Sequence, residues 1–328
     1  MIGSTMDRLI RRPARYFYDD FMRRGGIGNT MRASKAYNRL RYASRWREHR
    51  RCYDEAFDRL LKENNGDTPA NVATNVMRDG WAIDTSKTLP HLNELLDETD
   101  AIIQQRAGVK DLKRRVNLDK PFWQSLLEPG DLERCPSFLN FILSSPVLET
   151  IGRYMQIVPV LSKTMPPGVR FVESNAAFED EPNPPLRSSQ LFHLDIHDSP
   201  LVYVLVLLRD TTMEHGPWCF LPASVSSRAE RALGYRRWRA PYRITDEQMY
   251  AHVDPKELIP FTYPRGTVLF IDTSRCFHYG SRNSIKPRMQ MMYGFTSACR
   301  TDLTLTYMKP QRFPLSSSDQ TLRKLVLQ

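Results

Sequence analysis

The chain has 328 residues, of which 41% are hydrophobic and 26% are charged. This composition is typical of a globular protein and excludes a collagen, a coiled coil and a wholly disordered chain. No apolar run approaches the roughly 18 residues that a membrane-spanning helix requires. The length predicts one large domain with appendages or two domains of modest size.

The net charge of +10 is concentrated at the N-terminus. Residues 1–52 contain 14 Lys and Arg against 4 Asp and Glu, so the rest of the chain is neutral. We predict a basic helical extension over residues 1–65, because the apolar positions between Met31 and Leu61 fall roughly on one side of a helix. Two interpretations stay open. The helix packs on the body with a solvated charged face, or the basic arm contacts an acidic surface such as anionic lipid, nucleic acid or a partner.

The five cysteines are odd in number and widely spaced, and no C-x-x-C pair occurs. This pattern disfavours a zinc ribbon or a disulfide framework and favours a reducing compartment. Together with an N-terminus that has no apolar signal region, it predicts a cytoplasmic protein.

The predicted elements change in character along the chain. A turn at residues 77–80 leads into a short strand, and helices are predicted over residues 89–105 and 136–154. Short strands separated by Pro, Gly, Asp and Ser follow at 158–162, 169–173, 191–196, 202–208, 218–221, 257–263, 267–271, 289–296 and 303–307. Such strands indicate a β-sandwich or jelly roll. The prediction is an α+β chain with a mainly β core, an insert at 226–251 and a C-terminal tail at 311–328.

The most informative pair is His193 and Asp195, two residues apart on a predicted strand. Side chains at i and i+2 of a strand project from the same face. An imidazole beside a carboxylate supplies two ligands of a 2-His-1-carboxylate triad, which holds Fe(II) and leaves coordination positions open. The plain alternative is a hydrogen-bonded pair at a strand end.

A third ligand is expected to be a histidine on a later strand, and the candidates are His215, His252 and His278. His215 lies in a turn and His252 lies in the insert. His278 follows the apolar strand 267–271, which in a closed antiparallel fold returns the chain to the first pair. We therefore predict His278 as the third ligand.

A cationic partner for a cosubstrate carboxylate is predicted at Arg288, ten residues after His278. The planar guanidinium binds a carboxylate with two parallel hydrogen bonds. Arg282 is the alternative anchor, but its place in a turn favours an exposed charge or a substrate contact.

At these residues the sequence resembles the phytanoyl-CoA dioxygenase family of Fe(II)/2-oxoglutarate oxygenases. The segments that carry the resemblance are QLFHLD, LVLLRDTTMEHGPWCFLPAS and RGTVLFIDTSRCFHYGSRNSIKPR, preceded by MRDGWAI. The resemblance implies a cupin-like double-stranded β-helix over residues 66–310 with flanking helices. It also implies that His193, Asp195 and His278 ligate iron, that Arg288 holds the distal carboxylate of 2-oxoglutarate, and that O2 is the oxidant.

The sequence departs from the family after the Gly-Pro pair of the second quoted segment. Family members often continue there with P-G-S-H, whereas this sequence has Pro222-Ala223-Ser224-Val225. The strand after the H-x-D pair is apolar apart from Tyr203, which is therefore our candidate for a second 2-oxoglutarate contact. His197 extends the alternation of the pair and is interpreted either as a pocket residue near substrate or as a structural one.

Three other features have mainly structural interpretations. We expect Cys276 to be a buried structural thiol and Trp218 to fill the core. The cluster Arg236-Arg237-Trp238-Arg239 is interpreted as a solvated loop or as part of a lid that selects the substrate.

The expected function is that of an Fe(II)- and 2-oxoglutarate-dependent dioxygenase. It would hydroxylate a C–H bond of a small or carrier-bound organic substrate and release succinate and CO2. The carboxylate of Asp195 favours hydroxylation over halogenation, since related halogenases have a small residue there. Two alternatives are weighed: a catalytically inactive jelly roll that acts through its basic arm, and a cupin-like metalloenzyme, whose usual H-x-H pattern is missing.

Overall fold

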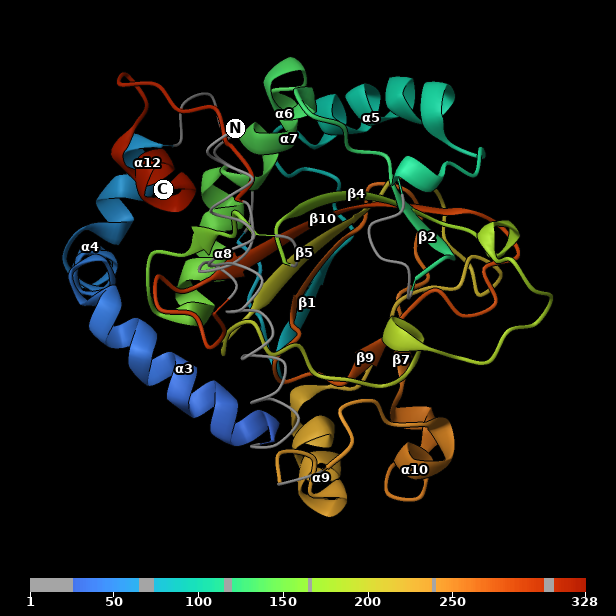
Figure 1. Ribbon diagram of the computed structural model, residues 1–328. Coiled ribbons are helices and arrows are strands. Elements are labelled where there is room, and N and C mark those ends of the chain that lie inside the picture. The colour runs from blue at the N-terminus through green and yellow to red at the C-terminus, as the bar shows by residue number, and fades with distance from the viewer. Residues whose placement is uncertain (1–25, 65–73, 115–119, 165–166, 238–239, 304–309) are drawn as a thin grey trace, which may run out of the picture.

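The computed structural model describes residues 26–64, 74–114, 120–164, 167–237, 240–303 and 310–328, and shows two β-sheets enclosed by helices (Figure 1). Within these ranges the larger sheet has the strand order β1-β8-β5-β10-β4-β2, and β3 pairs with β10 beside this path. All its pairs are antiparallel. Its strands are β1 (Trp81–Asp84), β2 (Trp123–Ser125), β3 (Val160–Leu161), β4 (Val169–Ser174), β5 (Val202–Leu207), β8 (Val268–Asp272) and β10 (Arg288–Thr296).

The smaller sheet has the order β7-β6-β9, formed by β7 (Ile259–Pro260), β6 (Cys219–Phe220) and β9 (His278–Tyr279). Single antiparallel bridges continue it sideways, first from His278 to His193 and then from Phe192 to Ile244. The predicted strand 191–196 is therefore reduced to these bridges. Two antiparallel sheets with flanking helices confirm the predicted class, a jelly roll with a mainly β core.

Side-chain alternation along the strands separates two apolar layers. On β5, Val202, Val204 and Val206 pack with the helices that cover the larger sheet. Tyr203 and its alternate neighbours on the same strand face the smaller sheet instead. Because the period of a strand is two residues, every second position on the larger sheet faces the space between the sheets. This inner face is where a site has room to form.

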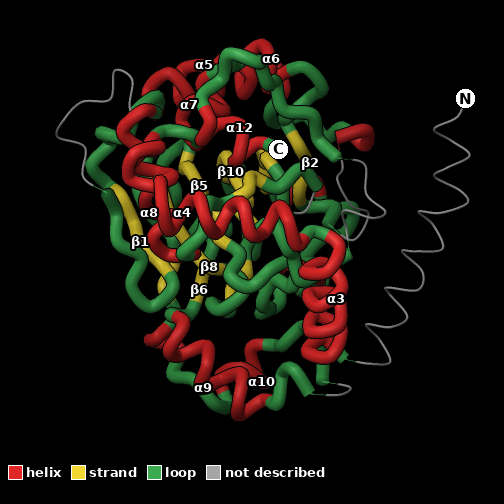
Figure 2. The backbone as a smooth tube through the Cα atoms, turned by 90° about the vertical axis from the view of Figure 1, so that its left-hand side faces the viewer, coloured by secondary structure: helices red, strands yellow, loops and turns green. Residues whose placement is uncertain are grey.

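Helices cover the outer face of each sheet. A cluster over the larger sheet includes residues of α4 (Ala43–Glu63), α5 (Leu92–Arg106), α7 (Ser137–Ile142), α8 (Ser145–Met155) and α12 (Thr321–Leu327). A second cluster joins the outer side of the smaller sheet to α3 (Ile27–Arg41), α9 (Ala223–Leu233) and α10 (Asp246–Tyr250). Figure 2 shows α9 and α10 together at the end of the molecule below β6. The remaining short helices are α6 (Asp131–Arg134), η2 (Leu112–Arg114), η3 (Ala176–Phe178), η4 (Ser188–Gln190) and η5 (Pro255–Glu257).

The helix expected between Met31 and Leu61 is interrupted at Tyr42, whose φ of −114° and ψ of 27° are not helical. The interruption follows from packing. The Asn38 side chain donates hydrogen bonds to the carbonyls of Arg300 and Asp302, at 2.8 and 2.6 Å, which ties α3 to that corner. The next helix, α4, then takes its own direction against α8 and α12.

The helix expected over residues 136–154 is likewise two helices, α7 and α8, that meet at Leu143 and Ser144. Pro146 lies in the first turn of α8. Proline fits the first turn of a helix but disrupts its interior, so a continuous helix through Pro146 is unfavourable.

Several expectations concern segments that are only partly described. The predicted strand 303–307 lies outside the described residues apart from Leu303, as do residues 1–25 of the basic arm.

The five cysteines are free thiols. Among the described residues, no helix has the length and apolar character needed to cross a bilayer.

Candidate metal centre

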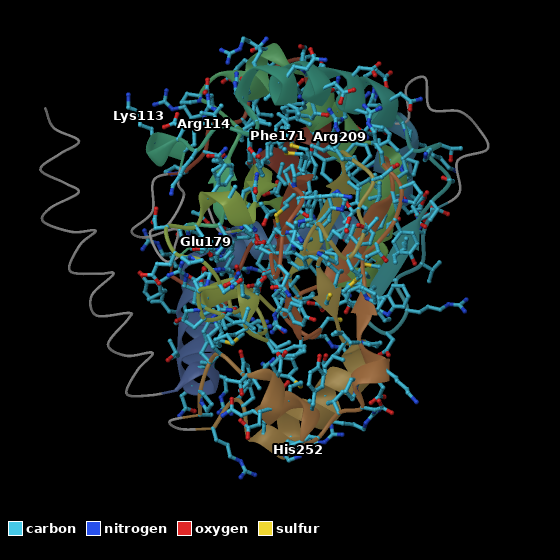
Figure 3. All side chains as sticks on the ribbon, turned by 90° about the vertical axis from the view of Figure 1, so that its right-hand side faces the viewer. Lys113, Arg114, Phe171, Glu179, Arg209 and His252 are labelled. Atoms are coloured by element: carbon cyan, nitrogen blue, oxygen red, sulfur yellow. The ribbon has the colours of Figure 1, made fainter. Side chains whose placement is uncertain are left out.

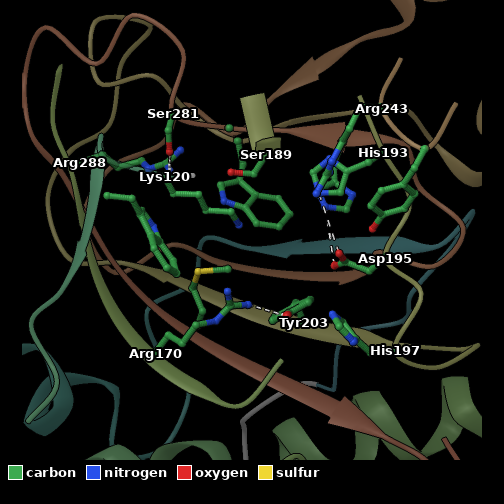
Figure 4. Close-up of a pocket in the computed structure, with 16 residues that line it drawn as sticks. Lys120, Arg170, Ser189, His193, Asp195, His197, Tyr203, Arg243, Ser281 and Arg288 are labelled. Carbon is green, nitrogen blue, oxygen red and sulfur yellow. Dashed lines mark hydrogen bonds and ion pairs between the residues drawn. The ribbon is translucent and has the colours of Figure 1, made fainter. Parts of the chain in front are cut away.

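The bridge between His193 and His278 brings the two imidazole rings together between the sheets, with centroids 4.3 Å apart. Asp195 completes the group: its Oδ1 lies 3.9 Å from His193 Nε2 and its Oδ2 lies 3.8 Å from His278 Nε2. One ligand atom from each residue lies within 4.8 Å of the others. The three residues predicted as ligands thus converge on one point, and Figure 4 shows His193 and Asp195 facing each other there.

Backbone carbonyls fix the tautomer of both histidines. His193 Nδ1 lies 2.8 Å from the carbonyl of Leu191, and His278 Nδ1 lies 3.0 Å from the carbonyl of Cys276. A carbonyl only accepts, so each Nδ1 carries the proton and donates it. The lone pair is then on Nε2, the atom that faces Asp195, which is the arrangement a metal-binding histidine needs.

The site favours neutral rings and an ionised carboxylate. Burial, reinforced by Arg243 and by His278, holds the pKa of His193 well below its ordinary value, and burial also lowers the pKa of His278. For Asp195 burial acts in the opposite direction, but His278, His197 and a hydrogen bond from Thr273 outweigh it and lower the pKa. Two neutral imidazoles and one carboxylate are the charge states in which these groups coordinate a divalent metal.

Trp218 belongs to the apolar cluster between the sheets, in keeping with the expected core role, and it also lies on the wall of the cavity at the site. Its indole stacks flat on His278. The two ring centroids are 4.7 Å apart and the planes differ by 4°. The indole therefore limits the rotation of a proposed metal ligand as well as contributing apolar contact.

Arg288 is a buried cation, with 2% of its surface exposed. It donates from Nη1 to the carbonyl of Gly216 at 2.5 Å and from Nη2 to Ser281 Oγ at 3.0 Å, while Nε has no hydrogen-bond partner. Within the described ranges no carboxylate forms an ion pair with it, and burial lowers its pKa to about 10. An uncompensated buried charge is costly, so this guanidinium is suited to an anionic ligand.

Gly280 keeps the space in front of Arg288 open. A Cβ on this glycine would lie 3.2 Å from Trp218 Cδ1 and 3.4 Å from Arg288 Nη1. Both separations are tighter than ordinary contact, so a side chain here would crowd the two groups that face the cavity.

The proposed metal ligands and Arg288 line one cavity of about 110 Å³. Its other walls contain three further cations, Lys120, Arg170 and Arg243, whereas Asp195 is the one carboxylate that lines it. The full lining is Lys120, Trp123, Arg170, Ser189, His193, Asp195, His197, Tyr203, Trp218, Tyr242, Arg243, His278, Gly280, Ser281, Arg288 and Met292. The cavity is therefore strongly cationic.

Tyr203 and His197, both proposed from the sequence, line this cavity. Tyr203 Oη accepts a hydrogen bond from Arg170 Nη2 at 2.5 Å. His197 Nδ1 lies 2.7 Å from Asp302 Oδ2, an oxygen to which Arg300 also donates at 2.9 Å. His197 is thus held by a buried ion pair while it lines the cavity.

Arg282 does not line the cavity, so the structure gives no support to its predicted substrate contact. Its Nη1 lies 2.9 Å from Asp246, and its Nε donates to the carbonyl of Gln190 at 2.5 Å. The guanidinium carbon lies 3.4 Å from the centroid of the Tyr279 ring. These contacts join the smaller sheet to α10, which is a structural role.

The histidines that were considered and set aside, His215 and His252, neither join the ligand group nor line the cavity. His215 accepts from the backbone N–H of Thr212 at 3.1 Å in its turn. His252 is exposed at the end of the molecule that carries α9 and α10 (Figure 3). Of the basic cluster in the insert, Arg236 pairs with Glu230 at 2.7 Å, and residues 238 and 239 lie outside the described part of the chain.

The thiol of Cys276 is buried, and burial raises its pKa well above the ordinary value. Its Sγ packs under the turn that precedes β1, where a Cβ on Gly80 would approach it to 2.8 Å. Gly80 also has a φ of +87°, which favours glycine. Cys276 does not line the cavity, in keeping with the expected structural thiol.

Sequence reasoning missed the cavity residues Lys120, Arg170 and Arg243. The position of Arg170 could have been predicted, because this charged residue interrupts the apolar run of β4. It lies two residues before Val172, which faces the space between the sheets, so both side chains are on the same face of the strand. Lys120 and Arg243 lie in irregular segments, where no periodicity indicates direction.

Comparisons with known proteins gave structural similarity only. No protein-family model matches the chain, and no curated protein matches it. Among solved structures, it is similar to HygX from Streptomyces hygroscopicus with nickel and 2-oxoglutarate bound, at 14% identity and a TM-score of 0.40 over 66% of this chain and 82% of that chain. It is also similar to the epimerase SnoN in complex with Fe3+, alpha ketoglutarate and nogalamycin RO, at 15% identity and a TM-score of 0.43 over 80% and 96%.

A third similar structure is EctD from S. alaskensis with 2-oxoglutarate and 5-hydroxyectoine, at 12% identity and a TM-score of 0.44 over 76% of this chain and 89% of that chain. Similarities at this level do not show a family. The function is therefore argued from the site itself.

Proposed function

We propose that the chain is an Fe(II)- and 2-oxoglutarate-dependent dioxygenase that hydroxylates a C–H bond of a small or carrier-bound substrate, as its resemblance to the phytanoyl-CoA dioxygenase family implies. One observation carries the proposal. A His-Asp-His ligand set and the buried, uncompensated Arg288 line the same cavity. A cytoplasmic location remains part of the proposal.

The ligand set fits ferrous iron. His193 and His278 present Nε2 lone pairs, Asp195 presents a carboxylate, and a set of only three protein ligands leaves positions for a cosubstrate and O2. When bound, the iron supplies the reduction of O2 that drives the overall reaction R–H + O2 + 2-oxoglutarate → R–OH + succinate + CO2. The carboxylate of Asp195 supports hydroxylation over halogenation.

The cavity also fits the cosubstrate. Arg288 would pair with the distal carboxylate of 2-oxoglutarate, and Ser281 would assist it. The Ser281 hydroxyl accepts from Arg288 and so keeps its own hydrogen free to donate. Tyr203 is in the same state, since its oxygen accepts from Arg170. We propose Tyr203 as the second cosubstrate contact.

The protein excludes competing water by burial. His193 and His278 are 4% and 2% exposed, and Trp218 covers one ring face. The two imidazoles are therefore held in place by carbonyls, and His278 also by stacking, which is the preorganisation that a metal site requires.

The alternative, an inactive jelly roll acting through its basic arm, rested on the apolar strand at 202–208. The structure does not favour it. The cavity in front of that strand is lined by four cations, two metal-competent imidazoles and Asp195. No observation on the described part of the arm points to a ligand for it.

The test is an anaerobic titration of the apoprotein with Fe(II) and 2-oxoglutarate, monitored by the visible charge-transfer band of the chelate. We expect the band in the wild type and its loss in His278→Ala and Asp195→Ala. Lys286→Gln is the matched control, since this exposed lysine lies outside the cavity and pairs with Glu214. Absence of the band in the wild type would contradict the proposed function.

A further inference from the structure

Arg243 lies beside His193, on the side opposite His278. Phe192 and Ile244 form an antiparallel bridge with backbone hydrogen bonds of 3.0 and 2.9 Å. In an antiparallel pair the residue after Phe192 lies next to the residue before Ile244. Arg243 is therefore the lateral neighbour of a proposed metal ligand, and Figure 4 shows both side chains directed into the same space above Asp195.

The guanidinium of Arg243 is not compensated by the protein. It lies over the Tyr242 ring, 4.5 Å from the centroid, and its buried Nη1 has no hydrogen-bond partner. Other arginines close by in the chain and fold are paired, Arg236 with Glu230 and Arg282 with Asp246. Over the described ranges no carboxylate forms an ion pair with Arg243.

A second uncompensated arginine faces the same space from the larger sheet. Arg170 is 8% exposed, and its Nε has no hydrogen-bond partner. Among the described residues its guanidinium donates one hydrogen bond, to the phenol of Tyr203. It stacks between Trp123 and Tyr203, with centroid distances of 5.6 and 5.1 Å. Arg170 is therefore a second buried cation that faces the cavity, and this observation is independent of those on Arg243.

The charges of the cavity do not balance with iron and cosubstrate alone. Even without Lys120, the described lining has three arginines, Arg170, Arg243 and Arg288, against the carboxylate of Asp195. Fe(II) adds two positive charges and 2-oxoglutarate adds two negative charges, so the positive excess persists. A guanidinium next to a metal dication in a buried site is strongly unfavourable unless an anion lies between them.

We propose that the substrate carries an acidic group, a carboxylate or a phosphate, and that Arg243 binds this group next to the metal centre with Arg170 facing it. The inference rests on the proposed function and adds the substrate class to it. The two anions then have separate partners. Arg288, on β10 of the larger sheet, takes the cosubstrate, and Arg243, on the segment that extends the smaller sheet, takes the substrate.

The experiment uses the full chain, loaded anaerobically with Fe(II) and 2-oxoglutarate and titrated with methylphosphonate and with acetate by calorimetry. We expect the wild type to bind at least one of these anions while its charge-transfer band persists. Arg243→Gln is expected to weaken that binding about tenfold or more, because charge-assisted hydrogen bonds are lost. Arg243→Lys is expected to retain part of it.

The matched control is Arg231→Gln, since Arg231 is an exposed arginine of the same insert and does not line the cavity. The affinity for 2-oxoglutarate, read from the band in Arg243→Gln, also reports that the variant is folded. Unchanged anion binding in Arg243→Gln would overturn the inference. A larger loss of 2-oxoglutarate affinity than of anion affinity would also overturn it, by assigning Arg243 to the cosubstrate.

The two proposals fail in different ways. A wild type without the charge-transfer band contradicts the proposed function, whatever the anions do. A normal band with anion binding that does not depend on Arg243 contradicts this inference alone.

Discussion

Arg288 makes its hydrogen bonds to one carbonyl and one hydroxyl, which leave its charge uncompensated until an anion arrives. We expect Arg288→Gln to raise the 2-oxoglutarate concentration needed to half-saturate the charge-transfer band by about 10- to 100-fold, the size of a lost charge-assisted contact. Arg288→Lys keeps the charge but not the planar fork, so an intermediate loss is expected. Equal affinity in all three proteins would contradict this role.

Asp198 gives a pH-dependent prediction. It is fully buried, accepts from the N–H groups of Ser199 and Ser297, and has a pKa raised by burial to about 6. The folded state then holds the proton more tightly than the unfolded chain, so this group's contribution to stability is present below pH 4 and is lost as the pH rises to about 6.

Asp198→Asn removes this titration, although it also disturbs one N–H contact at every pH. We expect the free energy of unfolding of the variant, relative to wild type, to rise by about 2 to 3 kcal/mol between pH 4 and pH 7. Chemical denaturation at several pH values measures this difference. A difference that stays constant with pH would show that Asp198 is ionised throughout.

Much of the candidate site could be predicted at the level of residues because strands impose a period of two. That period placed His193 with Asp195, and the hairpin before β10 returned Arg288 to His278. The place of Arg243 in the cavity could not be predicted in this way, because it depends on a single bridge between Phe192 and Ile244. No local pattern encodes which irregular segment will form that bridge.

Helix α8 packs against α4 at Gly152. A Cβ on Gly152 would lie 2.3 Å from Cζ of Phe57, which is 2% exposed. We expect Gly152→Ala to lower the free energy of unfolding by about 1 to 3 kcal/mol, the usual range for overpacking a buried contact. Denaturant titration is the measurement, and the charge-transfer band should be unaffected because the contact is remote from the cavity.

A second substitution checks the cause. Phe57→Leu shortens the ring that the new methyl group meets, so the double variant should be more stable than the sum of the two single effects predicts. Additive effects would mean that the alanine destabilises the helix for another reason.

At the level of elements, the sequence predicted the strands of the core better than the helices around it. Alternating or apolar runs marked β4, β5, β8 and β10 with few errors in their bounds. The breaks at Tyr42 and Ser144 depend on which surfaces the flanking helices reach, and that is a property of the tertiary structure. β2 was missed because a strand of three residues is too short for periodicity to show.

The whole molecule uses its N-terminal helices as part of the body. Lys35 donates to the carbonyl of Ser199 at 3.0 Å, and Asn38 binds the corner that holds Asp302.

Removing residues 1–41 should destabilise the fold, because α3 then no longer covers the smaller sheet or supports the loop of His197. We expect a lower free energy of unfolding by denaturation and weaker formation of the Fe(II)–2-oxoglutarate chelate. A free energy of unfolding equal to that of the full chain would show that α3 is dispensable to the fold.

The flat stacking of Trp218 on His278 also gives the protein an internal optical probe. Indole emission is quenched by a transition metal a few ångströms away, and Trp218 contacts the imidazole that we propose as a metal ligand. Metal loading, exchange of one ion for another and arrival of ligands in the cavity should each register in the fluorescence of the unmodified chain. Trp218→Phe, which keeps an aromatic ring against the imidazole, would identify how much of that signal comes from this residue.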